Sequence, residues 1–224
     1  MGGSFKKVFI ENDRWKLYLE GLGNSLQVAF FGFLLAFVLG VFLALTLYYA
    51  QRKKKLKWLA FIIRQYINLI RAIPLLLLLL LGYFSILVFI ESAILIAILV
   101  FGIHSSAYIA EIIRGGIESV DKGQVDAAKS LGFSYNQTML KIVLPQGLKN
   151  CLPSIGNELI TLLKMTSIVG WISIIDLTQA ANIISTNTFE FFMPLVIIAI
   201  VYVVLVSILS LTFKMIERWL GRYS

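Results

Sequence analysis

Residues 21–51 read GLGNSLQVAFFGFLLAFVLGVFLALTLYYAQ, a run of 31 residues without a charged side chain. A helix that spans a bilayer needs about 20 apolar residues. The run is therefore long enough to cross a membrane, and it is much longer than the apolar core of a signal peptide. Because it has no clear cleavage site, we interpret it as a retained transmembrane helix. Basic residues follow it at once: Arg52, Lys53, Lys54, Lys55 and Lys57.

The composition of the whole chain agrees with a membrane protein. Of its 224 residues, 59% are hydrophobic and 14% are charged, whereas soluble domains have about 45–50% and about 25%. The mean hydropathy is +0.88. A globule of this size cannot bury so much apolar surface, so we predict an all-α integral membrane protein. The single cysteine excludes an internal disulfide, and the single histidine disfavours a histidine-rich metal site.

Four further apolar stretches bring the number of predicted transmembrane helices to five, in one domain over residues 1–224. They cover residues 72–90, 92–110, 155–175 and 191–213. Residues 1–20 carry several aromatic side chains and predict an amphipathic segment at the membrane surface. Residues 111–149 hold nine charged side chains and predict a folded polar loop between the third and fourth spans, centred on residues 118–149.

The distribution of basic residues predicts the orientation in the membrane. Segment 51–71 holds seven, segment 111–149 holds five and segment 214–224 holds three, so these hold 15 of the 20. Because Lys and Arg concentrate in cytoplasmic loops, we predict a cytoplasmic polar loop and C-terminus, with the N-terminus outside. Four basic residues before residue 20 count against this orientation but are outnumbered.

The position of the basic residues at the ends of the spans also argues against nucleic-acid binding. We interpret Asp176 and Glu190 as solvated charges at the outer rim of the protein.

The polar loop contains two motifs with a physical reading, DAAKSLG at residues 126–132 and IVLP at residues 142–145. Two adjacent alanines leave a low helix surface that another protein can approach closely. Gly132 can adopt a positive φ, which lets a short helix turn sharply. Pro145 fits the first turn of the next helix. The loop therefore predicts a short, exposed helix held between two spans.

These motifs, together with AYIAEIIRGGI at residues 107–117, resemble the permease subunit of ATP-binding-cassette (ABC) importers of polar amino acids. The resemblance covers residues 20–218. It implies the MetI-like fold of a type I importer permease, in which the exposed segment is the cytoplasmic coupling helix that docks on a separate ATPase. Aspartate stands at position 126 where the family usually has glutamate, so the charge is kept. The coupling residues that the resemblance implies are Asp126, Ala127, Ala128, Gly132, Leu144 and Pro145.

The resemblance also implies the partners and the place of the chemistry. The sequence has no phosphate-binding loop of the form GxxxxGK(S/T), so ATP and Mg²⁺ are expected on two partner ATPase subunits. This chain is then a non-catalytic permease without a cofactor of its own. Five helices seldom enclose a path for an amino acid, so a second permease subunit is expected, identical or homologous. An extracytoplasmic binding protein and the plasma membrane of a prokaryote complete the expected setting.

Polar residues in the predicted fourth span indicate a substrate path. At about 100° per residue, Asn157, Thr161 and Lys164 fall within about 60° of one another, with Glu158 at the edge. Ionisable groups at bilayer depth are costly and usually functional. We hypothesise that this stripe lines the path and that Glu158 pairs with the cationic group of arginine, lysine or histidine. The alternative is a structural ion pair, for example between Glu158 and Lys164.

Two residues late in the predicted third span, His104 and Ser105, are further candidates for substrate contact. A lone histidine in a helix is more often a hydrogen-bonded packing residue, so both readings stay open for His104. The alternative function is a secondary transporter or channel that works without an ATPase. The loop motif disfavours it, as does the absence of an internal repeat. A membrane enzyme is also disfavoured, because the sequence offers no His/Cys ligand set and no nucleophile elbow.

Overall fold

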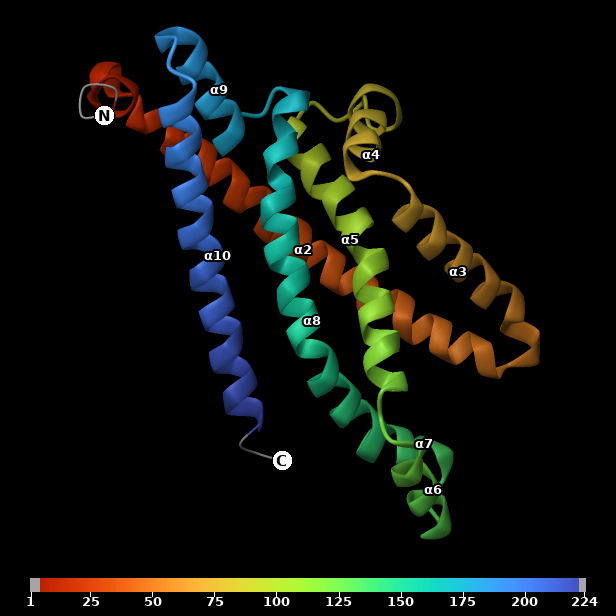
Figure 1. Ribbon diagram of the computed structural model, residues 1–224. Coiled ribbons are helices and arrows are strands. Elements are labelled where there is room, and N and C mark those ends of the chain that lie inside the picture. Colours follow the sequence, from red (N-terminus) through yellow and green to blue (C-terminus); the bar gives the residue numbers. More distant parts are fainter. Residues whose placement is uncertain (1–4, 222–224) are drawn as a thin grey trace.

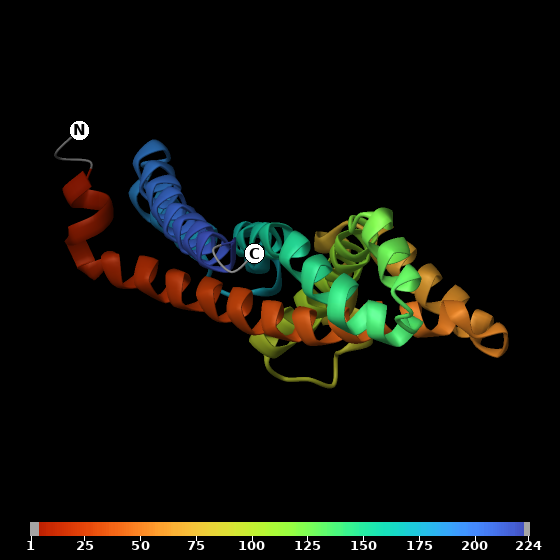
Figure 2. The same ribbon diagram turned by 90° about the horizontal axis from the view of Figure 1, so that it is seen from below.

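The computed structural model describes residues 5–221, which form an elongated, slanted bundle of helices (Figures 1 and 2). Residues 1–4 of the predicted surface segment and Arg222 of the predicted basic tail lie outside this range. The helices are α2 (Trp15–Arg52), α3 (Lys57–Ala72), α4 (Leu75–Leu81), α5 (Ala93–Glu118), α6 (Lys122–Ser130), α7 (Tyr135–Thr138), α8 (Leu144–Met165), α9 (Leu177–Thr188) and α10 (Phe192–Gly221). Short π or 3₁₀ turns cover Lys6–Ile10, Glu11–Asp13, Lys54–Leu56, Gly82–Ile86, Met139–Val143 and Thr166–Ile172.

The predicted all-α, multi-span class is confirmed. Within the described residues, three helices are long and apolar enough to cross a membrane, namely α2, α5 and α10. Two further pairs of helices are long and apolar enough only when the two members are taken together, and each pair is bent. Residues 57–86 bend by 102° between α3 and α4, and residues 135–188 bend by 51° before α9. The number of spans is therefore three, or up to five if each bent pair counts as one crossing.

The prediction of one continuous span over residues 72–90 is wrong. α3 ends at Ala72, and Pro74 stands immediately before the seven-residue helix α4. Proline lacks an amide hydrogen and disfavours a helical residue before it, so the helix breaks at this point. The helical part of the predicted span covers only α4 and the π turn that ends at Ile86, so a span in this region must include α3. The approach through α3 is amphipathic, with Ala60, Ile63, Ile67 and Ile70 buried.

The predicted third and fourth spans are longer than residues 92–110 and 155–175, so the polar loop ends before the predicted residue 149. α5 continues through Glu111 and Arg114 to Glu118, and α8 begins at Leu144 rather than near residue 155. The charges at the end of α5 fit a helix because they pair along it. Arg114 lies 2.7 Å from Glu111 and 2.6 Å from Glu118, at the i, i+3 and i, i+4 spacings that helices favour. The loop between the two spanning helices is therefore residues 119–143.

α2 and α5 cross at very short range through small residues. These recur at every fourth position: Gly32, Ala36 and Gly40 on α2, and Gly102, Ser106 and Ala110 on α5. A Cβ atom at Gly40 would lie 2.6 Å from Ile109 Cγ2 and 3.0 Å from the Ser106 carbonyl oxygen. In a bilayer, helices associate through such close packing because lipid is as apolar as leucine. The α2–α5 crossing is therefore the packing core of the bundle.

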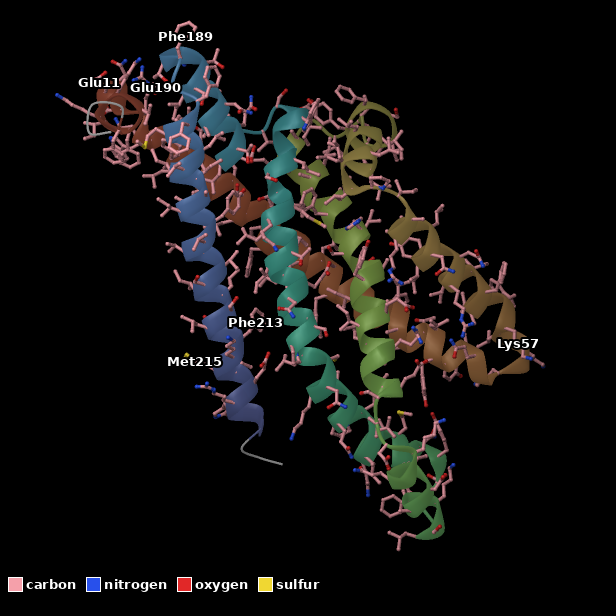
Figure 3. The ribbon with its side chains drawn as sticks, viewed as in Figure 1. Glu11, Lys57, Phe189, Glu190, Phe213 and Met215 are labelled. Carbon is pink, nitrogen blue, oxygen red and sulfur yellow. The ribbon has the colours of Figure 1, made fainter. Side chains whose placement is uncertain are left out.

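The two ends of the bundle carry different elements. The N-terminal end of α2, α4 and α9 lie at one end, and α6, α7 and the C-terminal end of α10 lie toward the other (Figure 1). The N-terminal segment is attached to its end by Val8, which is fully buried, and by Lys7, whose Nζ donates to the Thr188 carbonyl oxygen at 2.7 Å. Figure 3 shows Glu11, Phe189 and Glu190 at this same end. The polar loop and the C-terminal end thus lie away from the N-terminal segment.

We expect Gly40→Leu to destabilise the bundle, because the added side chain collides with Ile109. Overpacking of this kind costs about 1–3 kcal/mol or more, and each kcal/mol lowers the melting temperature by about 2–4 °C at this chain length. Thermal unfolding of the purified protein in detergent measures the shift. Gly23→Leu is the matched control, since nothing lies within 4 Å of a Cβ at this α2 position. Equal melting temperatures for the two variants would contradict the close crossing.

Candidate functional site

The projecting helix α6 is capped at both ends by residues next to it in the sequence. At its start, the Asp121 side chain accepts a hydrogen bond from the Gln124 amide at 3.3 Å. At its end, Gly132 has a φ of +82°. The Phe133 amide donates to the Ala128 carbonyl at 3.0 Å and the Gly132 amide donates to the Lys129 carbonyl at 2.9 Å, which is the Schellman motif. The predicted short helix with a sharp glycine turn is confirmed.

The two alanines of α6 lie on different faces. Ala127 and Asp126 are exposed, whereas Ala128 packs inward and is 2% exposed. Asp126 pairs with Lys129 at 2.9 Å on the helix surface. Sequence reasoning missed Leu131, which follows this surface and is 78% exposed. The outer surface of α6 therefore combines a small residue, an ion pair and one exposed leucine.

Two hydrogen bonds connect the polar loop to α8. The Gln146 side-chain amide in the first turn of α8 donates to the Gln124 side chain of α6. The Asn150 amide of α8 donates to the Ser119 hydroxyl at the end of α5, at 2.9 Å. Leu144 and Pro145 lie in this first turn of α8 rather than beside the exposed surface of α6. The polar loop is therefore fixed to the first turns of α8 at two points, one on α6 and one directly after the end of α5.

The predicted stripe on α8 is arranged as follows. Asn157 and Lys164 are exposed, and Thr161 and Glu158 are half-buried. The Glu158 carboxylate interacts with the Ser105 hydroxyl of α5, so two of the predicted site residues are brought together across helices. Within residues 5–221, Glu158 forms no ion pair with Lys164. The stripe is thus an accessible polar face with one carboxylate at its edge.

His104 lies apart from this stripe. It is 3% exposed, and its ring packs against Tyr108 with the centroids 5.0 Å apart. Its Nδ1 atom has no hydrogen-bond partner among the described residues. In this conformation His104 is a packing residue of α5, because burial separates it from the exposed polar face.

Two charged groups differ from the sequence interpretation. Asp176, interpreted as a solvated rim charge, is fully buried. Its carboxylate accepts hydrogen bonds from the Thr178 and Gln179 amides at 2.9 and 3.2 Å, which caps the start of α9. Sequence reasoning also missed a link between α3 and α5, where Arg71 lies 3.7 Å from Glu111. The Arg71–Glu111 pair is revealed only by the tertiary fold, because the two residues are far apart in sequence. The burial of Asp176 is likewise tertiary, although the amides that it caps are next to it in sequence.

A bundle of bent membrane helices with one closed helix projecting from its end is the architecture of a transport permease driven by a separate motor protein. Comparison with known proteins defines the family. Residues 36–222 match the model of the binding-protein-dependent transport system inner membrane component. The chain therefore belongs to this family, the permease subunits of ABC transporters, and is a multi-pass protein of the bacterial inner membrane. As a permease subunit it is non-catalytic and has no cofactor of its own, since ATP binds to the ATPase partner.

Individual relatives cover nearly the whole chain. The probable glutamine ABC transporter permease protein GlnM of Bacillus subtilis is 36% identical over 94% of this chain and 96% of its own length. The arginine transport system permease protein ArtQ of the same organism is 37% identical over 89% of this chain and 90% of its own. A crystal structure of an amino acid ABC transporter with histidines has a TM-score of 0.83 at 38% identity, covering 91% of this chain and 94% of that one.

A more distant structure supports the fold alone. The inward-facing MetNI methionine ABC transporter has a TM-score of 0.78 at 19% identity, covering 94% of this chain and 99% of that one. The MetI-like fold implied by the sequence motifs is confirmed. Family membership implies an assembly with ATPase subunits and a binding protein.

Gly132→Val should loosen the end of α6, because a β-branched residue at positive φ costs about 1–3 kcal/mol. We expect faster amide hydrogen exchange over residues 122–133, with the spans unaffected. Gly132→Asn is the matched control, since asparagine tolerates the left-handed region. Equal protection of α6 in the two variants would contradict a terminus that depends on this backbone geometry.

Proposed function

We propose that the chain is the transmembrane subunit of an ATP-driven importer of polar amino acids, with a preference for basic ones. One observation carries the proposal. The projecting helix α6 is joined to the first turn of α8 by the Gln146–Gln124 hydrogen bond, and α8 also carries the exposed polar stripe. One helix therefore connects the surface suited to an ATPase with the residues suited to a substrate path.

The preference for basic substrates rests on Glu158. Its carboxylate is half-buried and lies near the neutral Ser105 hydroxyl, and it forms no ion pair with a cation among the described residues. A carboxylate at bilayer depth is stabilised when a cation pairs with it. An arginine, lysine or histidine substrate would supply this cation. The relatives named for arginine and the structure with histidines agree with such substrates, and the relative named for glutamine extends the range to neutral polar ones.

The coupling role rests on the outer surface of α6. Asp126 and Ala127 are exposed, so they contact the ATPase directly. Gly132 ends the helix at a positive φ, and Ala128 packs on its buried side. Leu144 and Pro145 begin α8 and act by positioning the loop relative to the spans.

The assembly follows from the same arrangement. We infer two permease subunits, identical or homologous, two ATPase subunits and an extracytoplasmic binding protein. The end of the bundle that carries α6, α7 and the C-terminal end of α10 (Figure 1) faces the cytoplasm. The basic residues that surround these elements support this orientation, and the N-terminal segment then lies outside.

The decisive experiment is ATP-driven uptake by the complex reconstituted with its ATPase and binding protein. Labelled arginine is the substrate, and each charged and polar amino acid is added as a competitor. Uptake that requires ATP and is inhibited best by basic amino acids supports the proposal. Uptake that proceeds without the ATPase would establish a secondary transporter or channel instead.

Ala127→Trp should uncouple transport from ATP hydrolysis, because a large side chain prevents close docking of α6. We expect uptake to fall by about tenfold or more, which corresponds to about 1.4 kcal/mol of lost interaction. Basal ATP hydrolysis should persist without stimulation by the loaded binding protein. Ala127→Ser, which adds one atom at the same exposed position, should transport normally. Normal uptake by the tryptophan variant would exclude this surface from coupling.

Glu158→Gln should reduce the preference for arginine over glutamine by about tenfold, because removing a paired charge costs more than 1 kcal/mol in a site of low polarity. Competition of the two amino acids for uptake measures this ratio. Glu20→Gln removes an exposed carboxylate near the start of α2 and should leave the ratio unchanged. An unchanged ratio in both variants would show that Glu158 does not select the substrate.

A further inference from the structure

A polar pocket of about 370 Å³ lies beyond the end of α8. One wall is the 3₁₀ turn Thr166–Ile172, which contributes Ser167 and Trp171. The other wall is the start of α9, which contributes Thr178, Gln179 and Asn182. Pockets that hold small molecules are about 300–1,000 Å³, so this volume suits a ligand the size of a free amino acid.

The base of the pocket is formed by a buried carboxyl group, Asp176. Asp176 lines the pocket but is itself fully buried, and two backbone amides at the start of α9 hold its carboxylate in place. Gly170 permits this arrangement, because a Cβ atom there would lie 3.2 Å from Asp176 Oδ1 and from Gln179 Oε1. Asp176 is therefore a positioning residue. It orients the first turn of α9, which contributes the Thr178 and Gln179 side chains to the pocket wall.

The walls provide groups that both donate and accept hydrogen bonds. The hydroxyls of Ser167 and Thr178 and the carboxamides of Gln179 and Asn182 have this property. Trp171 is 67% exposed and offers an aromatic face that attracts cations. No Lys or Arg is among the lining residues. A zwitterion fits this set, since its ammonium suits the carboxamide oxygens and the indole, while its carboxylate suits the hydroxyl and amide donors.

The pocket continues the stripe of α8. Ser167 lies three residues beyond Lys164, so the series Asn157, Thr161 and Lys164 runs along the helix toward the pocket wall. α9 lies at the same end of the bundle as the N-terminal segment, far from α6 (Figures 1 and 3). The pocket is therefore at the end of the stripe that is opposite the coupling helix.

We propose that this pocket is an outer subsite, which holds a polar amino acid in its zwitterionic form before the amino acid moves along the α8 stripe. The proposal rests on the proposed function, because it needs the stripe to be the path and this end of the bundle to face outward. It adds a second, distinct binding position to that path. The residues that contact the ligand are Ser167, Trp171, Thr178, Gln179 and Asn182.

Trp171 makes the proposal testable in the intact permease–ATPase complex. Glutamine or arginine is added to the complex in nanodiscs, without ATP and without binding protein, and tryptophan fluorescence is recorded. Binding in the pocket should change the emission in a saturable way, and Trp171→Phe should abolish this change. Leucine serves as a probe of similar size without a polar side chain and should bind more weakly.

Asn182→Leu should raise the apparent Kd for glutamine by about 3- to 10-fold, the expected effect of losing one hydrogen bond. Asn187→Leu makes the same substitution on α9 at an exposed position that does not line the pocket, and it should bind as the wild type does. Gln179→Leu provides a second test if Asn182→Leu lowers the melting temperature of the complex.

The outcomes separate the two proposals. If the wild-type complex transports polar amino acids but shows no emission change that depends on Trp171, the outer subsite is overturned and the proposed function stands. The same holds if both pocket variants bind glutamine as well as Asn187→Leu does. If the wild-type complex transports no amino acid with ATP, both proposals fail.

Discussion

Two helices in a bilayer gain little by burying apolar side chains against each other, since the lipid they leave is equally apolar. α2 and α5 instead associate through small residues that bring their backbones together, as at Gly40, where a Cβ atom would lie 2.6 Å from Ile109. α5 then forms a second close crossing on its far part. A Cβ atom at Gly116 would lie 2.6 Å from the Gly147 carbonyl oxygen of α8. α5 therefore packs closely against α2 on one side and against α8 on the other, and it sets the position of α8 relative to α2.

This arrangement explains why coupling and transport residues share one helix. α8 begins beside the polar loop, where Gln146 contacts Gln124 of α6. Its middle places Glu158 against Ser105 of α5, and the turn after it forms a wall of the outer pocket. A close-packed helix moves as a unit because its neighbours have few voids to absorb a displacement. In the proposed function, a shift imposed at α6 reaches the stripe and the pocket through α8.

Much of the coupling helix could be predicted from sequence, because its determinants are local. Gly132 defines a turn through its own backbone, and Asp121 caps the helix that directly follows it. The remaining features depend on partners that sequence does not show. Pro74 marks a break in the helix, but its 102° angle depends on how α3 and α4 pack against the rest of the bundle. Arg114 pairs with Glu111 and Glu118 along α5. These pairs allow α5 to continue past residue 110, where the charged residues had led us to end the third span. Asp176 was interpreted as a rim charge because its burial comes from the packing of α2 and α9 around it.

α10 differs from the other long helices in how it is held. Its most apolar stretch is only 11% buried, although Phe213 lies against Gly156 of α8 (Figure 3). The rest of this chain thus covers little of α10, which leaves its surface to lipid or to the second permease subunit of the proposed assembly. In biosynthesis it has the apolar length to insert by itself after the earlier helices have assembled. When detergent replaces lipid, α10 is the helix whose environment changes most, so the choice of solubilising agent bears first on this part of the molecule.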